Sequence, residues 1–405
     1  MKQKILILLL FVLGARVGIY AQDYVFTGSF EACKEKAQQE GKIILIDLYF
    51  EGCMPCKQMD EQVFPNAEVA RRLASDFILY KTDVFKEEDG MKLARKYAAS
   101  GFPTYVAVDA AGKVLDIEAG FMAVNRFIPF LQQLKNKREE QQFLAFDAYL
   151  DYVYPASYNY RYMRKGEKGD FGELPFFLKG KSLYDEVPFV VSTLVNTQEV
   201  NEWVYAHLPE LIERYSGTLL LNKVNKLVEQ RLQAFGKQQH LDSIAVTLNR
   251  VRPVYNDRLW SVYLPIHINN YYKGSKDALV YLDLMDKYSL FSSWDERSNA
   301  LAEVIIDQKD NKKALTRLSA LFLEAKKSKP FAPVDNYKFA IIYAYLGDWN
   351  GAKKEMSLLL QQDISTSRLT LKDTDITALK EAVEQKNISH FQPVVAKKAL
   401  AITMN

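Results

Sequence analysis

Two cysteines separated by two residues, Cys53 and Cys56, are the side chains in this sequence best suited to chemistry. They enclose Met54 and Pro55, and Lys57 follows them. A cysteine attacks as its thiolate, and a second thiol within reach can close a disulfide with it. The pattern points to thiol–disulfide exchange, with Cys53 as the exposed attacking sulfur and Cys56 as the buried resolving sulfur.

The segment before the cysteines predicts the element that positions them. Residues 43–50 form an apolar run interrupted by one acid, Asp47, and this run is typical of a buried strand. The residues after Cys56 predict a helix, so Cys53 is expected where the strand ends and the helix begins. Unpaired N–H groups at a helix N-terminus lower the pKa of a thiol. Pro55 suits the first helical turn, where its missing N–H has no cost.

Four features together resemble the thioredoxin superfamily, and within it the extracytoplasmic thioredoxin-like proteins. The segment from Cys53 to Lys57 resembles the Cys-X-Pro-Cys-Lys motif of that family. Asp47 matches the buried acid beneath the family's active site, and Lys81 matches the lysine that pairs with it. Gly101-Phe102-Pro103-Thr104 matches the loop that faces the disulfide. The resemblance covers roughly residues 24–137.

The resemblance implies a role for each matching residue. Asp47 would help to take the proton from the thiol of Cys56, and Lys81 would tune Asp47; the alternative is an ion pair with no kinetic role. Pro103 would follow a cis peptide bond and leave the backbone of Phe102 free to pair with an extended substrate; the alternative is an ordinary turn proline. Met54, Pro55, Phe102 and Pro103 would form the substrate-binding surface. No cofactor is implied.

One position departs from the family pattern. Many members have tryptophan immediately before the first cysteine, whereas Gly52 stands there in this sequence. Met54 is also not the usual small residue, and the residues between the cysteines tune the redox potential. The family's potentials and substrate range therefore do not carry over to this chain.

Other interpretations of the cysteines are a structural disulfide or a soft-metal site. A metal site needs further cysteine or histidine ligands, and the four histidines all lie in the predicted helical region: His207, His240, His267 and His390. Copper bound by two thiolates stays an alternative, but no metal is predicted. The third cysteine, Cys33, follows helical spacing with Phe30 and Ala37, which indicates a core residue. A third redox thiol is the alternative and would require exposure near Cys53.

Periodicity and turn residues predict the order of elements in the first third of the chain. A helix begins after Ser29 and ends at Gly41. From there the predicted order is βαβαββα, as in a thioredoxin-like sheet. The strands are expected at 43–50, 77–84, 104–108 and 113–117. The first helix of this order is expected in two parts, 55–63 and a further set of helical turns from 68 to 74, and the other two helices at 90–97 and 124–134.

The length of 405 residues predicts two or three domains. The predicted fold is an α/β thioredoxin-like domain followed by an all-α helical-repeat domain. The charged run 135–140 marks the domain boundary. It is expected to be a solvated helix that continues into residues 143–152, and a flexible linker is the alternative. Residues 154–190 fit an ordered insertion, a substrate-facing loop or a mobile connector. The expected divisions are a signal peptide (1–21), the thioredoxin-like domain (22–137), a connector (138–194) and the helical domain (195–405).

Three alanines in the helical region recur at spacings of 36 and 38 residues: Ala278, Ala314 and Ala352. Each follows a polar turn and precedes apolar residues four and seven positions later. This resembles tetratricopeptide repeats, in which small residues let paired helices pack closely; a weaker copy surrounds Ala245. The alternative is a generic helical bundle. Stacked helices of either kind offer an extended surface that suits a protein or peptide partner.

The first 21 residues are typical of a signal peptide. They contain Lys2, Lys4 and Arg16 but no acid, with an apolar core at residues 5–13 that is short for a membrane span. An export signal predicts a periplasmic protein; an uncleaved membrane anchor is the alternative. Beyond this segment, basic and acidic residues balance, which argues against a nucleic-acid partner.

Together these observations predict an exported thiol–disulfide oxidoreductase that reduces the disulfides of client proteins. The resemblance to reducing members favours this direction and implies an upstream thiol donor in the membrane. One alternative is an oxidase or isomerase that uses the same chemistry. Another is a protein-binding helical scaffold in which the thioredoxin-like domain is not catalytic.

Overall fold

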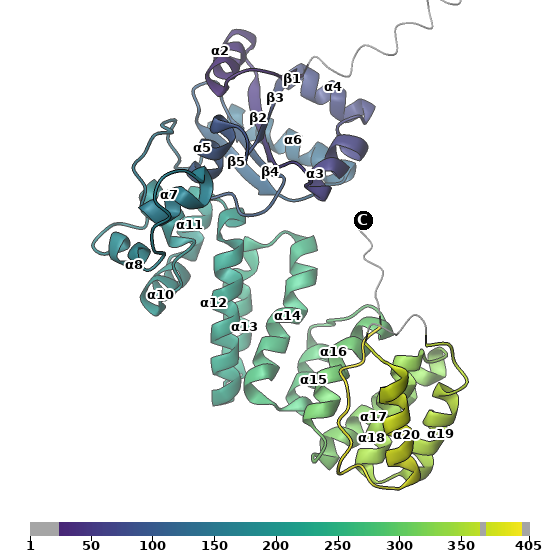
Figure 1. The fold of residues 1–405 in the computed structure, drawn as a ribbon. Coiled ribbons are helices and arrows are strands. Elements are labelled where there is room, and N and C mark those ends of the chain that lie inside the picture. The colour runs from purple at the N-terminus through teal and green to yellow at the C-terminus, as the bar shows by residue number, and fades with distance from the viewer. Residues whose placement is uncertain (1–23, 365–369, 399–405) are drawn as a thin grey trace, which may run out of the picture. The chain divides into compact units, whose positions relative to one another are not determined.

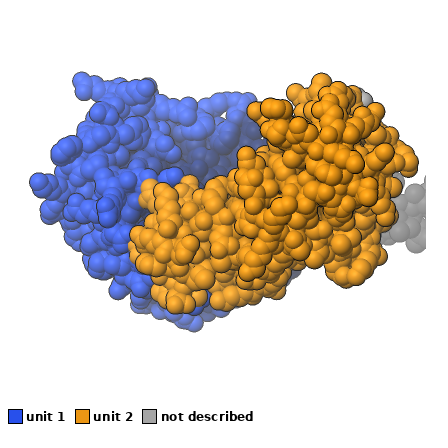
Figure 2. All heavy atoms as spheres, turned by 90° about the horizontal axis from the view of Figure 1, so that it is seen from below, with its two compact units in different colours: residues 1–227, 248–256 blue, residues 228–247, 257–405 orange. Residues whose placement is uncertain are grey.

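The computed structural model describes residues 24–364 and 370–398 and contains two compact units. The first comprises the chain up to Leu227 together with Leu248–Asn256, and the second comprises Val228–Thr247 and the chain from Asp257 onward. Figure 2 distinguishes the two units by colour. The expected signal peptide lies outside the described residues.

The first unit begins with a thioredoxin-like α/β domain built on a mixed five-stranded sheet (Figure 1). The order across the sheet is β1-β3-β2-β4-β5, where β1, β3 and β2 are parallel and β4 and β5 are antiparallel to their neighbours. The strands are β1 (Val25–Phe26), β2 (Ile43–Tyr49), β3 (Phe77–Asp83), β4 (Thr104–Val108) and β5 (Val114–Ala119). Four were predicted, and β1 was missed because two residues carry no periodicity.

Helices cover both faces of this sheet, so β2 is buried along almost its whole length. On one face, Ile43 and Leu45 pack with α4 (Ala67–Asp76) and α6 (Val124–Glu139) into one apolar core. The other face carries α2 (Phe30–Glu40) and α5 (Glu88–Lys96) (Figure 1). The Ser29 hydroxyl caps α2 and Gly41 ends it at φ 65°, as predicted. Cys33 is completely buried in α2, which excludes the exposure that a third redox thiol requires.

The prediction of a helix that continues into residues 143–152 is wrong. Helix α6 ends at Glu139, and Gln141 turns the chain with a left-handed φ of 54°. The chain is then anchored at β5, where the N–H of Leu144 donates to the carbonyl of Val114 at 2.8 Å. Phe146 is buried between Tyr97 and Tyr215, with ring centroids at 5.2 and 5.0 Å. The attachment of Leu144 to β5 and the burial of Phe146 between two tyrosines therefore favour an extended conformation of this segment over a helix.

The connector (residues 138–194) is ordered and packs on the thioredoxin-like domain. It contains α7 (Ala156–Met163), α8 (Glu173–Leu178) and α9 (Glu186–Ser192). Lys96 of α5 is fully buried, and its Nζ lies 2.5 Å from a carboxylate oxygen of Glu186. A buried ion pair of this kind fixes position, because separating the charges would leave one of them buried alone.

The rest of the described chain is predominantly helical, as predicted (Figure 1). Its helices are α10 (Gln198–Ala206), α11 (Leu208–Tyr215), α12 (Gly217–Gln238), α13 (Asp242–Val251), α14 (Asp257–Ser275), α15 (Ala278–Lys287), α16 (Trp294–Asp307), α17 (Lys312–Ser328), α18 (Pro333–Leu346), α19 (Trp349–Leu359) and α20 (Asp373–Glu384). A short 3-10 turn, η2 (Arg252–Val254), follows α13. Within residues 24–364 and 370–398, no helix is both long and apolar enough to cross a bilayer.

The three recurring alanines are completely buried near the starts of their helices, α15, α17 and α19. Small buried residues at these positions allow helices to approach closely, and α18 packs extensively on α19. Ala245, in the weaker fourth copy, is only partly buried. The tetratricopeptide interpretation remains a prediction for this all-helical region.

Candidate active site

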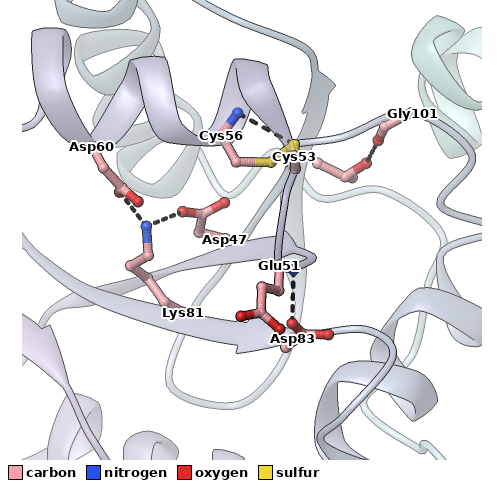
Figure 3. Close-up of a disulfide and its surroundings, with 9 residues drawn as sticks. Asp47, Glu51, Cys53, Cys56, Asp60, Lys81, Asp83 and Gly101 are labelled. Carbon is pink, nitrogen blue, oxygen red and sulfur yellow. Dashed lines mark hydrogen bonds and ion pairs between the residues drawn. A yellow bond between two sulfur atoms is a disulfide. The ribbon is translucent and has the colours of Figure 1, made fainter.

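Cys53 and Cys56 form a disulfide at the junction of β2 and α3 (Met54–Gln58) (Figure 3). Cys53 is the N-cap of α3, and the N–H of Cys56 donates to its Sγ at 3.3 Å. This bond is the local contact that would stabilise a Cys53 thiolate after reduction. Pro55 lies in the first turn, as predicted.

The active-site helix differs from prediction in one respect. After Gln58 it changes to a π-helical turn, η1 (Met59–Val63), in which the N–H of Phe64 reaches the carbonyl of Met59 five residues earlier. Such turns often occur next to functional sites. Met59 is fully buried, and its sulfur accepts the N–H of Met122, so η1 is anchored to the domain core.

The expected contrast in exposure between the two sulfurs is wrong for this oxidised state. Cys53 is 5% exposed and Cys56 is 4% exposed. Met54 is the exposed residue of the motif, at 64%. Before the first cysteine, Gly52 has a φ of 90°, a conformation that residues with a Cβ rarely adopt.

Asp47 is buried at 1% exposure on β2, and Figure 3 shows its side chain lying between the disulfide and Lys81. Its partner is Lys81, directly opposite on β3, with Nζ 3.0 Å from Oδ2. The other oxygen, Oδ1, is buried and has no hydrogen-bond partner among the described residues. Lys81 also pairs with Asp60, a half-exposed second carboxylate that sequence reasoning did not identify.

Burial raises the pKa of Asp47, and the nearby Lys81 ammonium only partly offsets this effect. Burial alone would lower the pKa of Lys81, but its pairs with Asp47 and Asp60 raise it overall. Lys81 therefore stays charged while the Asp47 carboxyl holds a proton more readily than a solvated aspartate. A group with these properties suits proton transfer close to a sulfur.

Two further polar residues lie in register with Asp47 across the sheet. Tyr105 on β4 lies opposite Asp47, and Glu118 on β5 lies opposite Tyr105. The Tyr105 hydroxyl is buried without a hydrogen-bond partner in the described part of the chain. Burial, reinforced by the neighbouring Asp116, raises the pKa of Glu118 to about 7. Neither residue was identified from the sequence, because strand register brings them into line.

The loop before β4 has the expected cis peptide bond between Phe102 and Pro103. The Thr104 hydroxyl donates to the carbonyl of Gly101 at 2.5 Å, and Figure 3 shows Gly101 on the Cys53 side of the site. Pro103 is buried and Phe102 is partly buried. Within the described residues, the backbone of Phe102 makes no hydrogen bond, so it can pair with an added strand.

Asp83 holds the turn before the first cysteine in place. Its carboxylate accepts the N–H group of Glu51 at 3.0 Å (Figure 3). It also accepts the N–H group of Phe85 at 2.8 Å. The sequence contains no signal for this role, because the carboxylate reaches a loop 32 residues away. In the described ranges, no three His, Cys, Asp or Glu side chains cluster as metal ligands would.

Comparison with known proteins agrees with this geometry. Residues 30–135 match the family model described as a thioredoxin-like domain, and the cysteine pair lies within the match. The chain thus carries a thioredoxin-like domain followed by a helical region.

Among the curated relatives that the chain matches are thiol:disulfide interchange proteins DsbD. Those of Yersinia pestis (strain Pestoides F) and Colwellia psychrerythraea are each 30% identical to it, over 98 and 97 residues. These matches cover 24% and 23% of this chain and 16% of each relative, so the chain spans about a sixth of their length. A solution structure of a thioredoxin from Thermus thermophilus is 26% identical, with 27% of this chain and 85% of that chain covered and a TM-score of 0.25.

Proposed function

We propose that this protein is an exported thiol–disulfide oxidoreductase that reduces disulfides in client proteins. The observation that carries the proposal is the disulfide between Cys53 and Cys56 at the start of α3, with the buried carboxyl of Asp47 behind it. The matches to thiol:disulfide interchange proteins support the same class of chemistry.

The reaction begins from the reduced cysteine pair. The Cys53 thiolate attacks one sulfur of a client disulfide, the client S–S bond breaks, and the other client sulfur leaves as a thiolate. The Cys56 thiolate then attacks the Cys53 sulfur of the mixed disulfide, and the second client sulfur leaves. The client gains two electrons and, after protonation of its sulfurs, two protons. The protein loses two electrons and forms the disulfide found in this structure.

Asp47 serves the second step by accepting the proton of the Cys56 thiol. Its unpartnered Oδ1 is available for the proton, while Oδ2 is held by Lys81 at 3.0 Å. Lys81 acts as a positioning residue that limits how far burial raises the pKa of Asp47. Both residues act behind the disulfide and do not contact the client.

The client segment binds along the cis-proline loop. The free backbone of Phe102 pairs with it in an extended conformation, and Pro103 holds that backbone in place. Exposed Met54 and partly buried Pro55 provide apolar contact beside the cysteines. Main-chain pairing gives affinity without demanding one client sequence.

After each turnover the disulfide must be reduced again by a thiol donor. We assign this role to an upstream membrane thiol donor and place the protein in the periplasm, following the export signal predicted from the sequence.

The proposed domains are the redox domain (22–137), the connector (138–194) and a helical domain (195–405) that binds protein or peptide. An exposed apolar pair one turn apart on α14, Val262 and Ile266, favours the binding role.

The proposal is tested by turnover of the full chain with a disulfide peptide and a small dithiol as donor. Wild type should catalyse reduction, whereas Cys53→Ser should abolish it and Cys33→Ser should leave it unchanged. Equilibration with glutathione buffers then determines the direction: a strongly oxidising potential would indicate an oxidase or isomerase. Absence of turnover in either direction would favour the helical scaffold.

A further inference from the structure

Three phenylalanines from three separate loops form an aromatic surface beside the disulfide. Phe50 directly follows β2, Phe85 lies two residues after the end of β3, and Phe102 precedes the cis proline. Their ring centroids lie 5.3 Å apart for Phe50 and Phe85, 5.5 Å for Phe50 and Phe102, and 6.3 Å for Phe85 and Phe102. The carbonyl of Phe50 accepts the N–H of Cys53 at 3.1 Å. This phenylalanine cluster is therefore attached directly to the reactive turn.

The connector adds a cation to this surface. Arg164, exposed at the C-terminal end of α7, stacks on Phe85 with its guanidinium carbon 3.7 Å from the ring centroid. Helix α7 is fixed to α5, because the Tyr158 hydroxyl donates to the carbonyl of Arg95 at 2.8 Å and the Arg95 guanidinium donates to Asn159 at 2.7 Å. The position of Arg164 beside the cluster is thus built into the fold of the first unit.

Three groups of charged side chains of the thioredoxin-like domain around the disulfide are already paired. Glu51 pairs with Lys86, Lys57 lies 3.5 Å from Glu61, and Lys81 bridges Asp47 and Asp60. These pairs give the site no preference for a charged client.

Arg164 is the exception at this surface: it has no carboxylate partner in the described part of the chain. A guanidinium stacked on a ring keeps the N–H donors at its edge available, and their geometry matches a carboxylate.

We propose that Arg164 and the phenylalanine cluster form a client-docking surface that selects protein segments with an aspartate or glutamate close to the attacked cysteine. The client residue places its carboxylate on the edge of the Arg164 guanidinium, while apolar client atoms cover the rings. This inference rests on the proposed function and adds a substrate class to it. Because the charge pair lies at the rim, its main effect is on association and hence on kcat/KM.

The test uses the full-length reduced chain and three synthetic disulfide peptides that differ only in a residue flanking one cysteine: Glu, Gln or Lys. Wild type should reduce the Glu peptide about threefold faster than the Gln peptide in kcat/KM, and about tenfold faster than the Lys peptide, the scale of exposed charge pairs. Arg164→Glu should reverse the order of the Glu and Lys peptides. High salt should reduce both preferences.

Lys179→Glu provides the matched control, since it makes the same change of charge at an exposed connector position at the end of α8. It should keep the wild-type order of the peptides. Equal rates for the three peptides, or an order that Arg164→Glu leaves unchanged, would overturn the docking surface while the oxidoreductase assignment stands. Failure of wild type to reduce any of the peptides would overturn both.

Discussion

Asp47 and Lys81 face each other across the parallel strands β2 and β3, with 3.0 Å between Oδ2 and Nζ, and only the lysine has a second carboxylate partner. The pair is therefore asymmetric. Lys81 has Asp60 to balance its charge at the domain surface, whereas Asp47 keeps one buried oxygen unpartnered among the described residues. An acid that loses hydration without full compensation destabilises the folded state, so its presence here favours a functional role.

Asp47→Asn should slow the second exchange step more than the first. The variant keeps the shape of the side chain but cannot accept the proton of Cys56. The rate of the second step should therefore fall by about 10- to 100-fold, which is at or below the smallest effects typical of general base catalysis. Stopped-flow measurement of mixed-disulfide formation and decay separates the two steps. Asp60→Asn is the matched control, because it removes the other carboxylate of Lys81 and should affect resolution much less. Equal slowing of both steps would remove Asp47 from the mechanism.

The same variant should stabilise the oxidised protein at neutral pH. Burial raises the pKa of Asp47, so the folded state binds this proton more tightly than the unfolded state does. The resulting stabilisation of wild type is complete below the ordinary pKa of 3.8 and is lost as the pH rises through the folded-state pKa. Asp47→Asn should therefore raise the free energy of unfolding at pH 7. Urea denaturation should show the gain shrinking toward pH 3, and a loss at pH 7 would contradict it.

Glu118 should make a distinct contribution to pH dependence. Its pKa of about 7 lies above the ordinary 4.5, so the stabilisation from the neutral carboxyl is complete below pH 4.5 and is lost as the pH rises through 7. Glu118→Gln should flatten the fall in unfolding free energy over this range. Chemical denaturation of both proteins at several pH values measures the difference. Parallel profiles would show that Glu118 titrates with its ordinary pKa.

Gly52→Ala should destabilise the protein by about 1–2 kcal/mol because of its backbone conformation, since Gly52 has a φ of 90° and a Cβ there meets no atom within 4 Å. Gly101→Ala is the control. A Cβ at Gly101 also meets no atom within 4 Å, but the backbone there does not have a positive φ, so this substitution should change the free energy of unfolding very little. Gly52→Trp, which restores the common family residue, should carry the same penalty. Thermal unfolding of the oxidised variants checks all three, and equal costs at both glycines would refute the backbone explanation.

Lys96→Met should loosen the connector. The change leaves the Glu186 carboxylate buried without its ammonium partner, at a cost of about 3–5 kcal/mol. The double variant Lys96→Met/Glu186→Met removes both charges and should recover much of this loss. Urea denaturation gives the free energies, and limited proteolysis within residues 154–190 reports on the connector itself. A double variant as unstable as the sum of both single variants would show that the pair is not coupled.

Local signals in the sequence were sufficient to predict an element where residues at its ends favour a cap or a turn. Ser29 and Gly41 delimit α2, and the apolar run of β2 ends at the Glu51-Gly52 turn. The cysteine motif and the cis-proline loop could be predicted from the resemblance to the thioredoxin superfamily, because each is a contiguous motif in the sequence. Strand β1 and the π-helical turn at Met59 could not be predicted. The two residues of β1 are a strand only through their pairing with β3, and the π-helical turn is a local change of hydrogen-bond register with no periodicity of its own.

Several contacts between residues far apart in the chain could not be predicted from the sequence. Lys81 was predicted to pair with Asp47, but its second partner, Asp60, depends on how η1 lies over the sheet. The stacking of Arg164 on Phe85 joins residues from the connector and the redox domain, and no spacing rule connects them. The burial of Cys53 in the oxidised protein was also not predicted; its residue is 5% exposed, and its sulfur accepts the N–H of Cys56 in the first turn of α3.

Trapping with a Cys56→Ser variant tests the central claim most directly. The reduced variant is mixed with a disulfide-bonded client peptide, and the adduct is mapped by mass spectrometry after proteolysis. The account predicts a stable mixed disulfide between the client and Cys53, none on Cys33, and none when Cys53 is also replaced by serine. Absence of an adduct on Cys53, or one that forms equally well on Cys33, would contradict it.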